Sequence, residues 1–210
     1  MNVETWLAFV LACWIISLSP GAGAIASMAS GVNYGFARGY WNAVGLQLGL
    51  LVQVGIVAAG VGALLATSAL AFTLIKWFGV FYLLYLAYRQ WRAPIAAVEP
   101  SVPVLRAAQP LQLVMRGLVI NASNPKAVVF MLAVLPQFLD VNRALLPQYA
   151  AMAATMVVVD LVVMAGYTGL AARVLRALRS QRQQRMVNRS FAGLFAAAAG
   201  LLALVKRASV

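Results

Sequence analysis

The chain has 210 residues, of which 64% are hydrophobic and only 10% charged, and its mean hydropathy is +0.89; because soluble domains carry roughly 25% charged residues, this composition excludes an ordinary soluble protein. Sixteen basic and four acidic residues give a net charge of +12, but these charges lie between apolar runs, so we expect membrane lipids and not nucleic acid as their partner. With no histidine and one cysteine, an internal disulfide is excluded, and we expect no cofactor, no metal and no Ser-His-Asp chemistry.

Six apolar stretches are long enough to cross a membrane, for which about 20 residues suffice. The first two lie within uncharged runs of 33 residues between Glu4 and Arg38 and of 37 residues between Arg38 and Lys76. The other four are residues 69–88, 117–139, 145–172 and 190–205, of which the last is short. We therefore predict an all-α integral membrane protein with six transmembrane helices.

The basic residues predict the direction of these spans, because short cytoplasmic loops collect lysine and arginine. The connections after spans one, three and five hold eleven arginines, at positions 38, 89, 92, 106, 116, 173, 176, 179, 182, 185 and 189. The opposite side holds only Arg143, Lys206 and Arg207. We therefore expect both termini to lie outside the cytoplasm.

Two helix-breaking tripeptides interrupt the predicted spans one and four. They are Ser19-Pro20-Gly21 and Asn124-Pro125-Lys126, and the offset of 105 residues between them also maps Arg38 onto Arg143. Since each half has three spans, the second half enters the membrane in the opposite direction. This predicts one transporter domain built as a 3+3 inverted repeat, with half one at 1–91, a proline-containing cytoplasmic linker at 92–112 and half two at 113–210.

The two breaks also mark a candidate substrate site. A proline removes a backbone donor, so polar backbone is freed where lipid cannot satisfy it, and such breaks are tolerated only against protein or a wet cavity. Matching breaks in two halves are the sequence pattern of a substrate site in secondary transporters. The candidate substrate-binding residues are Ser19, Pro20, Gly21, Asn121, Asn124, Pro125 and Lys126. The alternative is a simple kink, since prolines are frequent in membrane helices.

Asp160 is the only acidic residue well inside a predicted span, and it must be paired, protonated or hydrated. Lys126 is the natural partner, because a buried carboxylate beside an ammonium costs much less than either group alone. The pair has two interpretations. One is a structural salt bridge between spans four and five. The other is proton exchange at Asp160, whose protonation changes when a substrate arrives.

Several motifs, in this order, resemble the lysine, homoserine and threonine exporter (LysE/RhtB-type) family of bacterial inner-membrane efflux proteins. They are Ser19-Pro20-Gly21, residues 29–39, Gly45-Leu46-Gln47-Leu48-Gly49, Lys76-Trp77-Phe78-Gly79, residues 117–138 with Asn124-Pro125-Lys126 and Leu135-Pro136-Gln137-Phe138, and Asp160 with Tyr167. The chain departs from the family pattern at Ala22, where a second proline is usual.

The resemblance implies export of amino acids or close derivatives from the cytoplasm, driven by the proton gradient. Asp160 would then be the proton-coupling group, with Lys76, Gln47 and Tyr167 as supporting residues. A compatible mechanism follows from the residues. Half-helix amino termini and Lys126 meet the substrate carboxylate, while Asp160 and unwound carbonyls meet its ammonium. A proton that reaches Asp160 from outside would remove the counter-charge of the ammonium and favour release.

Other classes of function stay open at this point. Efflux of another small solute fits the same fold. An integral membrane enzyme lacks the clustered carboxylates, metal or histidine that its chemistry generally needs, so we expect no enzymatic activity. A membrane protein that transports nothing and only binds partners is a further alternative. Small-residue faces also allow a homodimer.

Overall fold

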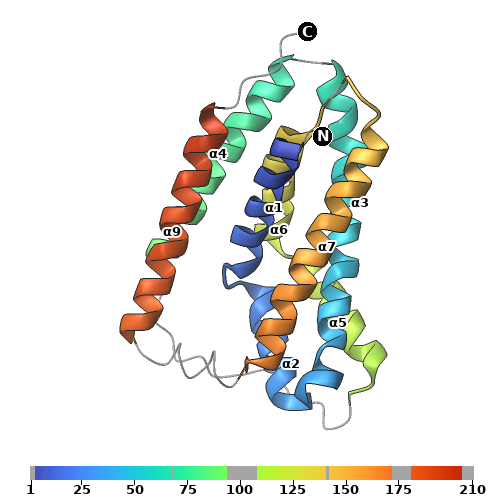
Figure 1. Cartoon of the computed structure of the whole chain (residues 1–210), viewed down its shortest axis with the longest axis vertical. Coiled ribbons are helices and arrows are strands. Elements are labelled where there is room, and N and C mark those ends of the chain that lie inside the picture. Colours follow the sequence, from blue (N-terminus) through green and yellow to red (C-terminus); the bar gives the residue numbers. More distant parts are fainter. Residues whose placement is uncertain (1–2, 68, 94–107, 141, 172–180, 205–210) are drawn as a thin grey trace.

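The computed structural model describes residues 3–67, 69–93, 108–140, 142–171 and 181–204, and every regular element in these ranges is a helix. In chain order they are α1 (Val3–Leu18), α2 (Ala22–Gly39), α3 (Trp41–Thr67), α4 (Ala69–Trp91), α5 (Pro110–Ala122), α6 (Pro125–Val134), the 3-10 helix η1 (Leu135–Phe138), α7 (Leu145–Gly169) and α9 (Gln181–Leu204). Figure 1 shows them side by side along the long axis, with the start of α1 and the end of α9 at the same end.

Both predicted tripeptides interrupt helices. α1 ends one residue before Ser19 and α2 begins one residue after Gly21, and the two helices meet at an angle of 58°. α5 and α6 are separated by Ser123 and Asn124, and this pair is also bent by 58°. The two bent pairs run in opposite directions along the molecule (Figure 1).

Local sequence explains where the two helices of the second bent pair, α5 and α6, begin. Pro110 occupies the first turn of α5, and the backbone N–H of Gln109 donates to the side chain of Gln112 in a capping box. At α6, Asn124 is the N-cap, its side chain accepts from the backbone N–H of Lys126 at 3.1 Å, and Pro125 follows in the first turn. Asparagine before proline is therefore a helix start here, because the proline has no N–H to leave unsatisfied.

Among the described residues, length and apolar character identify fewer membrane spans than the six that the sequence predicts. Within the described residues, two helical stretches are by themselves long and apolar enough to cross a membrane. They are Trp41–Gly60 in α3 and Leu145–Gly169, the whole of α7. Counting each bent pair as one span gives up to four. The predicted spans at 69–88 and 190–205 correspond to α4 and α9, parts of which lie outside the residues on which this count rests.

Several sequence predictions fall on residues that the structure does not describe. Residues 94–107, most of the predicted linker at 92–112, lie outside the described ranges. So do Arg106, Arg173, Arg176, Arg179, Lys206 and Arg207.

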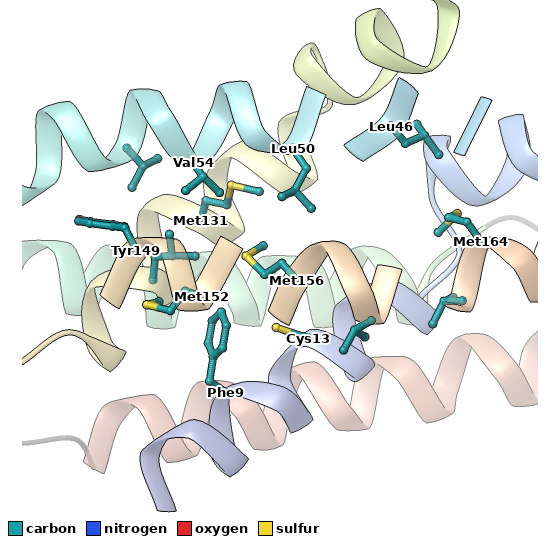
Figure 2. Close-up of a cluster of buried hydrophobic side chains, with 14 of the residues drawn as sticks. Phe9, Cys13, Leu46, Leu50, Val54, Met131, Tyr149, Met152, Met156 and Met164 are labelled. Carbon is teal, nitrogen blue, oxygen red and sulfur yellow. The ribbon is translucent and has the colours of Figure 1, made fainter. Parts of the chain in front are cut away.

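The hydrophobic core lies between α1, α3, α6 and α7. α7 buries Tyr149, Met152, Met156, Val159 and Val163, a spacing of three and four residues that places all five on one helix face. In Figure 2 the methionines of this face lie between Phe9 and Cys13 of α1 and the Leu50 and Val54 side of α3. α4 and α9 form a second core that includes Leu83 and Phe195.

Glycines bring α3 and α5 into backbone contact. A Cβ added at Gly45 would lie 2.0 Å from the carbonyl oxygen of Val114, and one added at Gly117 would lie 2.2 Å from that of Asn42. At Gly49 the nearest atom would be the Leu118 carbonyl oxygen, at 2.7 Å. Any larger residue would separate the helices. The small residues of the predicted second span therefore serve packing inside the protein.

Substituting Gly45→Ala should destabilise the protein, because the new methyl group overlaps backbone that cannot move alone. We expect a loss of about 1–3 kcal/mol, measured as a lower thermal unfolding midpoint of the purified protein. Gly55→Ala, in the same helix with no atom within 4 Å of the added Cβ, is the matched control and should leave the midpoint unchanged or higher. Equal midpoints for the two variants would contradict the close crossing.

Candidate functional site

Both helix breaks open into one cavity of about 90 Å³. Its wall combines α1, the first break, α2, α3, the end of α5, the second break, α6 and α7. The polar and charged side chains on the wall are Ser17, Ser19, Asn121, Asn124, Lys126 and Asp160, and Gly21, Gly23 and Cys13 also line it.

Asp160 lies on α7, and two neutral side chains bind its carboxylate. The Ser17 hydroxyl of α1 donates to Oδ1, and Nε2 of Gln47 on α3 donates to Oδ2 at 2.6 Å. Gln47 is itself buried. Donors that bind a carboxylate stabilise its charge without neutralising it.

Lys126 does not pair directly with Asp160. Its Nζ donates instead to the backbone carbonyl of Ser19 at 3.0 Å, and lies 5.5 Å from the centroid of the Phe195 ring on α9. Within the described ranges, the only ion pair within 4.0 Å joins Arg143 and Asp140. The predicted salt bridge is therefore wrong as a direct contact, because each group already has other hydrogen-bond partners.

The carbonyls at the end of α1 receive donors from the second half of the chain. Pro20 cannot continue the helical hydrogen bonds of α1, because it has no N–H. The Tyr167 hydroxyl on α7 donates to the Leu18 carbonyl at 2.7 Å, and Lys126 donates to that of Ser19. The break is thus satisfied by protein, as an apolar setting requires.

Asn121 connects the cavity to the contact between α3 and α5. Its side-chain Nδ2 donates to the backbone carbonyl of Leu46 on α3 at 2.7 Å. The backbone carbonyl of Asn121 accepts from Nε2 of Gln53 at 2.6 Å. Asn121 therefore has a positioning role besides lining the cavity. Within the described part of the chain, two buried side-chain oxygens near the cavity, Oγ of Ser19 and Oε1 of Gln47, have no hydrogen-bond partner.

The structure thus brings most of the predicted site residues together. Ser19, Gly21, Asn121, Asn124, Lys126 and Asp160 line the cavity. Gln47 contacts it through Asp160, Tyr167 through the Leu18 carbonyl, and Pro20 and Pro125 set the two breaks. Lys76 is not on the cavity wall, since its Nζ donates to the Ala203 carbonyl of α9 at 3.3 Å and lies 5.4 Å from the Trp77 ring centroid.

Three residues at or beside the site were missed by sequence reasoning. Ser17 is a polar residue in the apolar run before the first break, and that position was a usable signal. Cys13 lies one helical turn earlier on the same cavity wall. Phe195 carried no signal, because it is one of several apolar residues of α9.

Two broken helices that surround one cavity, with an acidic and a basic residue on its wall, are typical of membrane translocators. The sequence model of the LysE type translocator family matches residues 14–206, and the chain belongs to this family. In the described residues, no group of three or more His, Cys, Asp or Glu side chains is placed to hold a metal ion.

Three relatives illustrate the similarity. An uncharacterized membrane protein of Vibrio cholerae serotype O1 is 40% identical over 98% of this chain and 100% of its own length. A homoserine/homoserine lactone efflux protein of Salmonella typhimurium is 37% identical over 99% of this chain and 100% of its own length. A leucine efflux protein of Enterobacter sp. (strain 638) is 30% identical over 67% of this chain and 66% of its own length. No solved structure matches the chain.

Removing the Tyr167 hydroxyl should destabilise the first break. In Tyr167→Phe the Leu18 carbonyl loses its donor, and we expect a loss of about 1 kcal/mol of unfolding free energy, seen as a lower thermal midpoint. Tyr85→Phe changes an exposed tyrosine on α4 and serves as the control, with an unchanged midpoint. A Tyr167→Phe midpoint equal to that of the parent would show that this hydrogen bond does not stabilise the break.

Proposed function

We propose that the protein is a secondary active exporter of amino acids or close derivatives across the bacterial inner membrane, coupled to proton influx. One observation carries this proposal: two helix breaks, a carboxylate and an ammonium from different helices all meet at one cavity. The printed names of the relatives support the substrate class, since they are efflux proteins for homoserine, homoserine lactone and leucine.

The cavity offers partners for both charges of a zwitterion. The N-cap of α2 is Gly21, which provides no side-chain cap. The first N–H groups of α2 are therefore suited to a carboxylate, with the partial positive charge of a helix amino terminus. Gly23 and Ala24 of this turn line the cavity. Asp160 and the Ser19 carbonyl are suited to the ammonium. The departure at Ala22 does not displace the start of α2 from the cavity.

Asp160 is the group we assign to proton coupling. It is the acidic residue on the cavity wall, and its oxygens accept hydrogen bonds from Ser17 and Gln47. A proton that reaches it from outside removes the negative charge that holds the substrate ammonium. Release to the outside is then favoured, and return of the proton to the cytoplasm completes the exchange.

The transport assay follows directly. In proteoliposomes loaded with a panel of radiolabelled amino acids, we expect efflux of some of them to increase when a pH gradient is imposed. Asp160→Asn should abolish the stimulation by the gradient, because the amide keeps the shape and cannot exchange the proton. Asp140→Asn makes the same chemical change at a solvent-exposed acid paired with Arg143 and should transport like the parent.

Two results would contradict the proposal. Unaltered gradient-driven efflux in Asp160→Asn would remove the coupling role from this residue. No flux of any amino acid through folded, oriented protein would indicate another small solute or no transport at all.

We extend the proposal to six spans in a 3+3 inverted repeat, with halves at 1–91 and 113–210. Support comes from the two bent pairs of equal angle, each followed by a long apolar helix, α3 or α7, and from their opposite directions in Figure 1. α4 and α9 would be the third span of each half. A homodimer through small-residue faces belongs to the same proposal, because Gly55 and Gly60 on α3 face open space.

The proposed orientation places both termini outside the cytoplasm. In a Cys13→Ser background, Arg143→Cys should react with a membrane-impermeant thiol reagent on intact spheroplasts. Arg182→Cys, at the other end of the molecule, should react only after permeabilisation. Both side chains are exposed, so the difference would report the side of the membrane. The reverse pattern would invert the orientation.

A further inference from the structure

The ammonium of Lys126 lies in a site with the chemistry of a cation subsite. One partner is the Ser19 carbonyl oxygen at 3.0 Å, and the other is the Phe195 ring, whose centroid is 5.5 Å away. Carbonyl oxygens and aromatic faces both attract a primary ammonium, the second through the ring quadrupole. Phe195 is 2% exposed and packs in the α4–α9 core, so its ring is held in place.

The same cavity contains one fixed anion and one cation on a flexible stem. Asp160 is bound by neutral donors, whereas the Lys126 side chain passes over the first break. A Cβ added at Gly21 would lie 3.7 Å from both Cδ and Nζ of Lys126, so the lysine stem lies against this glycine. Four methylene groups allow the ammonium to leave the Ser19 carbonyl without any helix movement.

We propose that the Ser19 carbonyl and the Phe195 ring mark the subsite for the primary ammonium of the exported molecule, and that Lys126 fills this subsite whenever the substrate does not. The inference rests on the proposed export function. An amino-acid ammonium has the same charge and hydrogen-bonding capacity as the lysine ammonium, so the two compete. A bound substrate displaces Lys126, which is then free to pair with the substrate carboxylate.

The names of the relatives fit an ammonium subsite. Homoserine and its lactone both carry a primary ammonium, but only homoserine has a free carboxylate. An ammonium subsite therefore suits both molecules.

The replacement of the substrate ammonium by that of Lys126 in this subsite affects the rate of transport. Without substrate or Lys126, the Ser19 carbonyl would lack its donor inside an apolar bundle, which is costly. The substrate-free protein would then return slowly to the cytoplasm-facing state. Exchange of internal for external substrate would continue, because an ammonium fills the subsite in both directions.

The test compares two fluxes in the same proteoliposomes. Net efflux is measured into medium without amino acid, and exchange is measured with excess unlabelled amino acid outside. In Lys126→Gln we expect exchange to fall, because the substrate carboxylate loses a partner, and net efflux to fall at least about tenfold more than exchange. A parallel loss of both fluxes, or of neither, would overturn the inference.

Phe195 provides a second, milder variant. Phe195→Leu keeps an apolar side chain and removes the aromatic face, so the ratio of net to exchange efflux should fall about threefold to tenfold. Phe195→Tyr keeps the ring and should restore the ratio. Leucine and tyrosine variants with equal ratios would exclude a role for the ring.

The two levels of proposal fail in different ways. If the parent shows neither net efflux nor exchange of any amino acid, the export function itself is wrong. If the parent shows both and Lys126→Gln changes neither, export stands and the ammonium subsite does not.

Discussion

The satisfaction of backbone carbonyls at the end of α1 is the constraint on which the site depends. Inside an apolar bundle a helix can stop only if its last carbonyls find donors. Here the donors at Leu18 and Ser19 are side chains of Tyr167 and Lys126, which come from the other half of the chain. The first break is therefore completed by the second half, and the cavity exists only when both halves are folded together.

Much of the site was visible in the sequence because its determinants act locally. Proline and asparagine stop or start a helix wherever they occur, so both breaks were predicted at the right tripeptides. Asp160 and Lys126 were visible as charges within apolar runs. Their partners were not, because a hydrogen bond across helices depends on how each helix is rotated about its axis. Apolar runs such as α1 and α3 do not encode that rotation, and so Ser17 was missed and a direct ion pair was expected.

The helix boundaries show a similar division. α3 and α7 lie within the uncharged or nearly uncharged runs that predicted them. α9 begins at Gln181, nine residues before the predicted span at 190, because glutamine and arginine are good helix formers although they disfavour the membrane. Hydropathy predicts which part of a helix can enter lipid, and not where the helix starts. Phe195 could not be distinguished from its apolar neighbours for the same reason, since composition does not tell which ring faces a lysine.

The glycine contact between α3 and α5 limits how the protein can change shape. Backbone atoms there leave no layer of side chains whose rotamers could absorb a sliding movement, and the Asn121 and Gln53 hydrogen bonds add further connections. One helix comes from each half, so the halves are joined along this line, and they are joined a second time where α4 packs on α9. Alternate opening of the cavity to the two sides of the membrane would then be a rotation of the α4–α9 pair, as one unit, about α3 and α5.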